Sequence, residues 1–261
     1  MRRSILTAAL VLASGTLVLG PAATASDSYT VTESVSATNV DVGQSVTVRG
    51  HVSPIARQEW AVIQRKVGTS WTKVARDRIN RYGNYRATLP VTEPGDNEYR
   101  VLKRHSHGHL RGVSATFTVS GWRWRAVNTL PTSGAITNVS YLASGTLGTT
   151  GYPVTYSPLV KMGTAGSVSY VLAQKCTTFE GDVGVTPDST LDTVQTAIVG
   201  TFAEGGSPTQ IVGQDVRHNQ DPAHVVRTGT AISQAWGLNL TADSDAGASI
   251  GWGGARVYCK S

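Results

Sequence analysis

The chain has 261 residues, of which 40% are apolar and 15% charged, with a formal net charge of +6 at pH 7. This apolar fraction supports a packed core, and the abundance of Gly, Thr, Ser and Val is typical of extracellular β proteins with many turns. Beyond the N-terminus no stretch sustains a period of 3.6 residues, which excludes a helical protein.

The N-terminus has the features of a secretory signal peptide. Arg2 and Arg3 precede an apolar run over residues 5–19, and small residues follow up to Ala25. This pattern predicts a signal peptide over residues 1–25 and a secreted, extracellular protein. The alternative is an uncleaved anchor, but the run is short for a span of about 20 residues. No later segment is long and apolar enough to be a transmembrane segment.

The charge is unevenly distributed. Residues 27–120 carry 13 Lys and Arg against 8 Asp and Glu, whereas residues 121–261 carry 8 against 9. One interpretation is that the basic excess of residues 27–120 attracts anionic wall polymers or lipid headgroups. The other is that these charges form an ordinary solvated surface. Because no aromatic and basic platform is evident in the sequence, we expect no nucleic-acid partner.

Residues 26–120 are predicted to form a first domain of short antiparallel strands. Val46, Val48 and Val52 share one face of the first clear strand. Glycine-containing turns then separate further strands over residues 60–65, 71–75, 85–89, 99–102 and 114–119. This spacing predicts a small sandwich that ends near Ser120-Gly121, where Trp122-Arg123-Trp124 opens a region of different composition.

The first domain resembles the immunoglobulin-like repeats of secreted actinobacterial proteins. The matching segments are residues 46–50 (Val-Thr-Val-Arg-Gly), 64–68 (Gln-Arg-Lys-Val-Gly) with Trp71, 82–85 (Tyr-Gly-Asn-Tyr) and 99–101 (Tyr-Arg-Val). The resemblance implies a spacer or adhesion module without an active site.

His105, His107 and His109 are the one candidate metal cluster of this domain. Alternate residues of a strand point to one face, so three imidazoles at this spacing suit a metal ion. The neighbouring Ser106 and Gly108 favour instead a solvated hairpin tip.

Residues 121–261 are predicted to form a second β domain. Val168, Tyr170 and Leu172 alternate along one strand, and residues 179–185 along another. Further strands are expected at residues 193–199, 210–212, 236–241 and 255–258. A jelly-roll or a related sandwich fits this number of strands.

The second domain contains the only two cysteines of the chain, Cys176 and Cys259. An exported protein with two cysteines and no CxxC or Cys/His spacing is expected to form a disulfide. A bond between Cys176 and Cys259 would close a long loop and so restrict the unfolded chain, which stabilises the folded protein by on the order of 4 kcal/mol. The alternatives are two free thiols or half of a metal site.

The second domain resembles the NPCBM family, carbohydrate-binding modules with a galactose-binding-like jelly-roll fold. The segments that carry the resemblance are residues 151–152 with 157–159, 168–172, 176–185 around Cys176, and 252–259 around Cys259. The middle departs from the family, since Thr186-Pro187-Asp188 replaces its paired acidic residues and residues 202–206 only approximate its Asp-Gly turn. The resemblance implies binding to a glycan rather than catalysis.

Sugar binding needs aromatic faces against C–H surfaces, and amides or carboxylates for the hydroxyls. The candidate ligand-binding residues near the C-terminal strands are Trp236, Asn239, Asp243, Asp245 and Trp252. The alternative for both tryptophans is a buried position in the core. We expect no cofactor, although the Asp243-Ser244-Asp245 segment suits either a structural calcium ion or a plain turn.

The chain contains no nucleophile elbow, HExxH zinc motif or phosphate-binding loop. We therefore expect a non-catalytic, secreted protein that binds a carbohydrate or a cell-wall polymer. The alternatives are a structural or adhesion protein that contacts a surface protein, and a small polysaccharide hydrolase.

Overall fold

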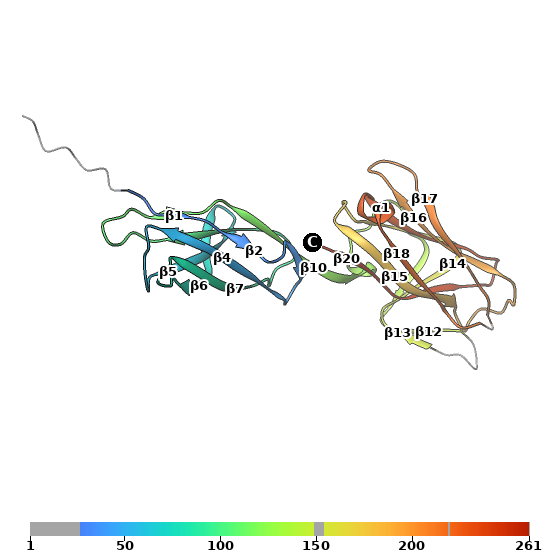
Figure 1. Ribbon diagram of the computed structural model, residues 1–261. Helices are drawn as coiled ribbons and strands as arrows, with labels where there is room; N and C mark the ends of the chain where they lie inside the picture. The colour runs from blue at the N-terminus through green and yellow to red at the C-terminus, as the bar shows by residue number, and fades with distance from the viewer. Residues whose placement is uncertain (1–26, 149–153, 219, 261) are drawn as a thin grey trace, which may run out of the picture.

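The computed structural model describes residues 27–148, 154–218 and 220–260. Figure 1 shows two lobes arranged end to end, with the chain entering at the outer end of the first lobe and finishing where the lobes meet. Nearly all regular structure is β-strand arranged in sandwiches, which confirms the predicted all-β class. The predicted signal peptide lies outside the described residues. Within them, no helix has the length and apolar character needed to cross a membrane.

The first lobe packs two sheets face to face. One sheet pairs β4 with β1, β2 and β7, and the other contains β3, β10, β8, β5, β6 and β9. The strands are β1 (Thr30–Val31), β2 (Ser34–Val35), β3 (Asn39–Asp41), β4 (Ser45–Ser53), β5 (Trp60–Val67), β6 (Ser70–Arg78), β7 (Asn84–Pro90), β8 (Gly95–Lys103), β9 (Gly112–Val113) and β10 (Phe117–Ala126). Val46, Val48 and Val52 face the core, as their alternation predicts.

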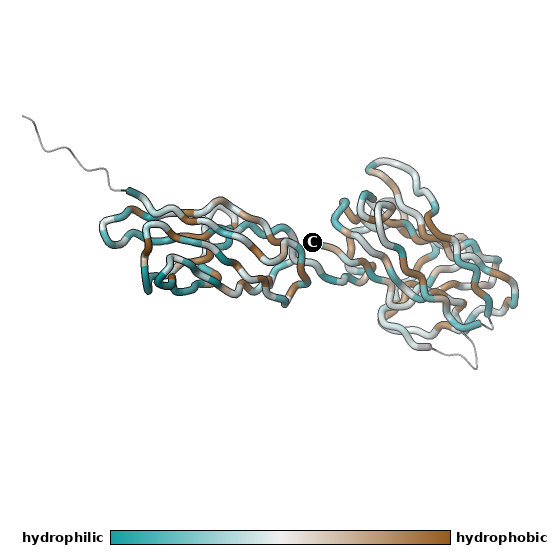
Figure 2. Tube along the Cα trace, in the orientation of Figure 1, coloured by the Kyte–Doolittle hydropathy of each residue, from teal (hydrophilic) through white to brown (hydrophobic). Residues whose placement is uncertain are grey.

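The second lobe is a larger sandwich in which two long strands link the layers. β14 pairs with β20 through its first residues and with β19 through its last ones. The elements are η1 (Val127–Thr129), β11 (Thr137–Leu142), β12 (Gly145–Leu147), β13 (Val154–Tyr156), β14 (Leu159–Val171), β15 (Cys176–Val185), β16 (Gln195–Phe202), β17 (Thr209–Val216), β18 (Ala223–Thr228), α1 (Thr230–Ser233), β19 (Gly237–Asp243) and β20 (Ile250–Cys259). Figure 2 shows apolar segments running along these strands.

The predicted disulfide is confirmed. Cys176 and Cys259 lie opposite each other at the ends of β15 and β20, with their Cα atoms 4.0 Å apart. Both side chains are buried in the core of the second lobe. The bond therefore ties the last strand of the chain to the middle of the same sandwich.

A single strand, β10, runs from one lobe into the other. Its first half pairs with β8, and its second half pairs with β20. The predicted boundary at Ser120-Gly121 lies inside this strand, and one hydrophobic core lies on each side of it. At Gly121 a Cβ atom would approach the Glu93 carbonyl oxygen to 2.3 Å, so glycine permits the close passage of the chain. The lobes are thus joined by continuous sheet.

Candidate functional site at the junction of the lobes

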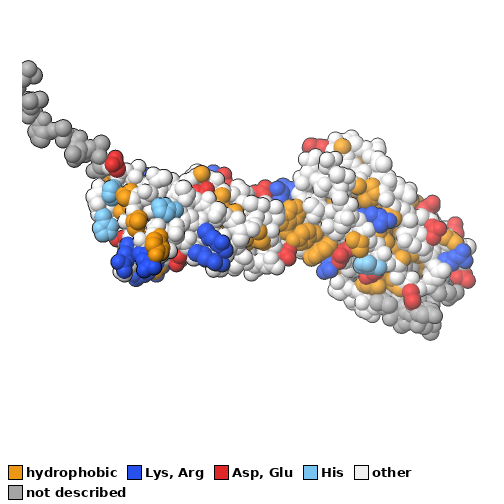
Figure 3. Space-filling model, viewed as in Figure 1, with side chains coloured by type: hydrophobic (Ala, Val, Ile, Leu, Met, Phe, Trp, Pro, Cys, Tyr) orange, Lys and Arg blue, Asp and Glu red, His pale blue; other side chains and the backbone are white. Residues whose placement is uncertain are grey.

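Three aromatic side chains lie together on the outer face of the junction. Trp122 and Trp124 alternate along β10, so both point to the same side, and Tyr258 lies opposite Trp124 on β20. The Tyr258 ring is 5.4 Å from that of Trp122, nearly parallel to it, and 5.3 Å from that of Trp124. Figure 3 shows apolar side chains gathered where the lobes meet. We call these three residues the aromatic strip.

A surface hollow of about 480 Å³ adjoins the aromatic strip. It is lined by residues from both lobes, so neither lobe forms it alone. The lining residues are Asn39, Val40, Asp41, Gln44, Trp122, Thr177 and Tyr258. We call this cavity the junction hollow. It combines two aromatic rings with two amides, a carboxylate and a hydroxyl.

Hydrogen bonds across the junction hold its aromatic walls in place. The Trp122 Nε1–H group donates to Asn39 Oδ1 at 3.1 Å, and the Tyr258 hydroxyl donates to Asp41 Oδ1. Burial, together with the neighbouring Asp41 carboxylate, raises the pKa of Tyr258 to about 12. The phenol therefore stays a protonated donor to Asp41 to a higher pH than an ordinary tyrosine would.

A second polar cluster fastens the end of the chain to the first lobe. The Lys260 ammonium lies 2.8 Å from Asp96 Oδ2, and the Ser120 hydroxyl donates to Asp96 Oδ1 at 2.5 Å. The hydrogen bonds from Lys260 and Ser120 lower the pKa of the Asp96 carboxyl below its usual range. The pKa of Asp96 is lower in the folded protein than in the unfolded chain. The ionised carboxylate therefore stabilises the fold at any pH above the pKa that Asp96 has in the unfolded chain. This stabilisation is lost as the pH falls through the lower pKa of the folded protein.

Asp96→Asn should therefore destabilise the protein at pH 7 and have no effect at a pH below the lowered pKa of Asp96. Urea unfolding of the variant and the wild type at a series of pH values would measure the difference. Glu204→Gln, an exposed carboxylate elsewhere, serves as the control. A destabilisation that persists unchanged in acid would contradict the role given to the Asp96 charge.

Two of the residues predicted from the sequence to contact a ligand are inaccessible. Trp252 is fully buried and packs edge-on against Phe179, with the ring centroids 5.6 Å apart. Asn239 is 7% exposed, and its amide nitrogen donates to Ser169 Oγ and to the Val168 carbonyl. Because both side chains are buried, we leave Trp252 and Asn239 out of the candidate site.

The remaining predicted residues are accessible but do not form one cavity. Trp236 is half-buried beside Phe202 and directly precedes β19, whereas Asp243 ends that strand. A strand of this length separates them by about 23 Å. The structure therefore does not bring Trp236 together with the turn over Asp243-Ser244-Asp245, which we call the acidic turn.

The acidic turn is braced by the protein's own groups. Asp245 Oδ2 accepts a hydrogen bond from Thr193 Oγ1 at 2.9 Å, and its backbone N–H donates to Gln195 Oε1 at 2.8 Å. In the part of the chain that the structure describes, no three His, Cys, Asp or Glu residues are arranged to hold a metal ion. These contacts favour the turn interpretation of Asp243-Ser244-Asp245 over the calcium one.

Of the three histidines predicted as a metal cluster, His107 and His109 contact different residues. Ser106 and His109 close a tight turn, His107 lies 3.6 Å from a Glu59 oxygen, and His109 packs against Tyr29. Over residues 27–148, 154–218 and 220–260 no metal-ligand set includes them. Their arrangement, like that of the acidic turn, is that of a surface loop.

Comparison with known proteins gives no family model and no curated protein that matches this sequence. Among solved structures, the CBM51-2 and INT domains of Clostridium perfringens ZmpB are 12% identical, with a TM-score of 0.43 over 66% of this chain. The chain spans 39% of the length of that structure. A tetra-tandem repeat from the extending region of a large adhesion protein is 13% identical, with a TM-score of 0.31 over 88% of this chain and 74% of the other.

Proposed function

We propose that this is a secreted, non-catalytic protein that binds a carbohydrate or a cell-wall polymer at the junction hollow. The observation that carries the proposal is the combination of Trp122 and Tyr258 with the polar groups of Asn39, Gln44 and Thr177 in one surface cavity. A sugar ring presents C–H groups that pack against aromatic faces, and its hydroxyls pair with amides and hydroxyls. The hollow offers both kinds of partner.

Two of the polar groups that line the hollow are available for a ligand. Among the described residues, the Gln44 amide and the Thr177 hydroxyl have no hydrogen-bond partner, and Gln44 is exposed. The rings, in contrast, are already fixed by Asn39 and Asp41. A cavity whose aromatic walls are held before binding loses little conformational entropy when the ligand enters.

The two resemblances found in the sequence agree with this proposal. The resemblance of the first lobe to immunoglobulin-like repeats implies a spacer, and the resemblance of the second lobe to the NPCBM family implies a module that binds glycans. In our proposal the ligand contacts both lobes at their junction, at residues other than those that the sequence predicts.

A glycan array, followed by pull-down on insoluble polysaccharides, tests the proposal. We expect the wild type to be retained by at least one glycan and the Gln44→Ala/Thr177→Ala variant to be retained less. Tyr82→Ala, an exposed aromatic residue at the far end of the first lobe, should bind as the wild type does. No retention on any glycan, or capture of a protein partner that sugars do not displace, would favour an adhesion protein instead. Release of product from a labelled polysaccharide would overturn the non-catalytic assignment.

A further inference from the structure

The basic residues of the first lobe, scattered along the sequence, gather on the outer face of one sheet. On β6, Arg76 lies opposite Val62 and Arg78 lies opposite Trp60. Arg100 on β8 lies opposite Gln64 on β5. The set is completed by side chains at neighbouring positions of β5, β6 and the β8–β9 connection. We define the basic face as Lys66, Lys73, Arg76, Arg78, Arg100, Arg104 and Arg111.

Acidic side chains neutralise little of this charge. Lys66 pairs with Glu98 at 2.5 Å. Among the described residues, Lys73, Arg104 and Arg111 are exposed and have no carboxylate partner. Burial, with the charge of Arg111, lowers the pKa of Arg100. The basic face is therefore a region of mutual repulsion that an anionic ligand would relieve.

Two arginines of the basic face are oriented by a tryptophan. The guanidinium carbons of Arg76 and Arg78 lie 4.1 and 4.8 Å from the centre of the Trp60 ring. A guanidinium in contact with a ring keeps N–H groups at its edge, where a phosphate accepts two of them at once. The same contacts cover Trp60, so its ring is not open for a nucleic-acid base to stack on it.

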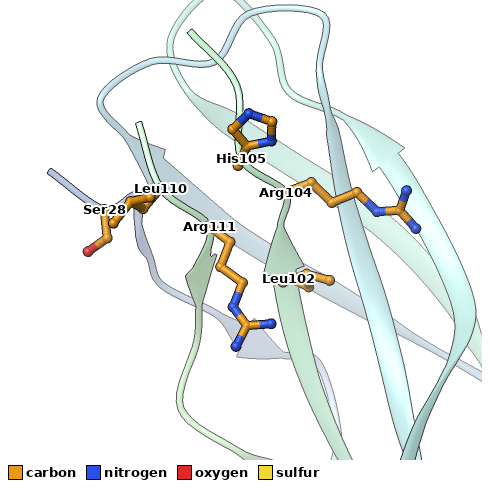
Figure 4. Close-up of a pocket in the computed structure, with 6 residues that line it drawn as sticks. All are labelled: Ser28, Leu102, Arg104, His105, Leu110 and Arg111. Carbon is orange, nitrogen blue, oxygen red and sulfur yellow. The ribbon is translucent and has the colours of Figure 1, made fainter. Parts of the chain in front are cut away.

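Two hollows lie along the basic face and share Arg104. One, of about 700 Å³, is lined by Leu102, Arg104 and Arg111, which Figure 4 shows with the two arginines extending on either side of the leucine. The other, of about 150 Å³, is lined by Trp60, Lys73 and Arg76, with Glu59 as its one carboxylate. Together they make an elongated track rather than one closed pocket.

The spacing of the charges suits a repeating ligand. Neighbouring strands lie about 5 Å apart, and alternate residues of a strand about 7 Å apart. An extended polymer with an anion in each short repeat would meet one cation after another, from Arg76 on β6 to Arg104 and Arg111 in the β8–β9 connection. A compact anion would use only one of these positions.

We propose that the basic face binds a linear polymer, other than a nucleic acid, that carries a phosphate group in each repeat. This site is separate from the junction hollow, because it is formed by the outer part of the first lobe, next to the entry of the chain (Figure 3). The protein would then hold a phosphate polymer on the outer part of the first lobe and a glycan where the two lobes meet. The proposal does not depend on the glycan site.

Titration of the full chain with long-chain inorganic polyphosphate, at several salt concentrations, tests this site. The logarithm of the binding constant should fall linearly with the logarithm of salt concentration. Arg104→Gln/Arg111→Gln should weaken binding about tenfold and reduce the salt slope by about two, since two phosphate contacts are lost. The single variant Arg111→Gln should show about half of the change in slope.

The matched control removes the same charge from the opposite sheet. Arg49 and Arg86 are exposed and lie opposite each other on β4 and β7, so Arg49→Gln/Arg86→Gln should bind polyphosphate as the wild type does. Equal losses in the two double variants would show that only net charge matters and would overturn the proposal. Tighter binding to single-stranded DNA or to phosphatidylglycerol vesicles than to polyphosphate would overturn it as well.

Discussion

Replacing Trp122 with alanine should lower the affinity of the protein for its glycan about 30-fold, the loss typical of an aromatic anchor in the centre of a site. Trp122 packs against Tyr258 and donates a hydrogen bond to Asn39. Its removal therefore takes away one aromatic wall of the junction hollow and leaves the ring of Tyr258, the other wall, without its packing partner. Calorimetric titration with the glycan that the array identifies would measure the change in the dissociation constant.

Two further variants separate stacking from hydrogen bonding at this position. Trp122→Phe keeps an aromatic face but loses the Nε1–H donor, so its affinity should lie between those of the wild type and Trp122→Ala. Tyr82→Ala removes an exposed ring far from the junction and should leave the affinity unchanged. Wild-type affinity in Trp122→Ala would show that the ligand does not use the aromatic strip.

Removing the disulfide should give the largest loss of stability. The Cys176→Ser/Cys259→Ser variant is expected to lower the free energy of unfolding of the second lobe by about 4 kcal/mol, because the unfolded chain regains the freedom of an 83-residue loop. Urea unfolding followed by tryptophan fluorescence would measure it. The same variant should weaken glycan binding, since Tyr258 precedes Cys259 on β20.

A reduction experiment supplies the control for the disulfide variant. Cys176 is 2% exposed and Cys259 is fully buried, so a mild reductant should cleave the bond only after the second lobe unfolds. Wild-type protein treated under native conditions should therefore keep its urea midpoint. An unchanged midpoint in the double serine variant as well would mean that the bond contributes no stability.

The sequence was sufficient for features that depend on local patterns. The alternation of Val46, Val48 and Val52 predicts their burial, and the count and setting of Cys176 and Cys259 predict the disulfide. These inferences need only the two-residue period of a strand and the redox state of exported proteins. The all-β class follows from the same signals.

The junction hollow could not be predicted because its contacts span the whole chain. Asn39 lies 83 residues before Trp122, and Asp41 lies 217 residues before Tyr258. The one local signal was a pair of tryptophans two residues apart, which a strand places on one face. Taken alone, that signal indicated only a change of composition at a domain boundary.

A β-bulge explains the inaccessible position of Trp252. The pairing of β15 with β20 shifts register between Glu180 and Asp182, and Gly254 on the facing strand has a φ of +60°. Successive side chains of β20 point alternately inward and outward, and the shift reverses this order beyond the bulge. Trp252, before the bulge, therefore faces the core, while Tyr258, after it, faces outward. An unbroken strand would have put both rings on one face.

A crystal structure of the protein with the array-identified glycan bound tests the central claim most directly. The account predicts a sugar ring packed against Trp122 and Tyr258, with its hydroxyls bonded to Gln44 and Thr177. A glycan bound at another surface, with the junction hollow free of ligand, would contradict it.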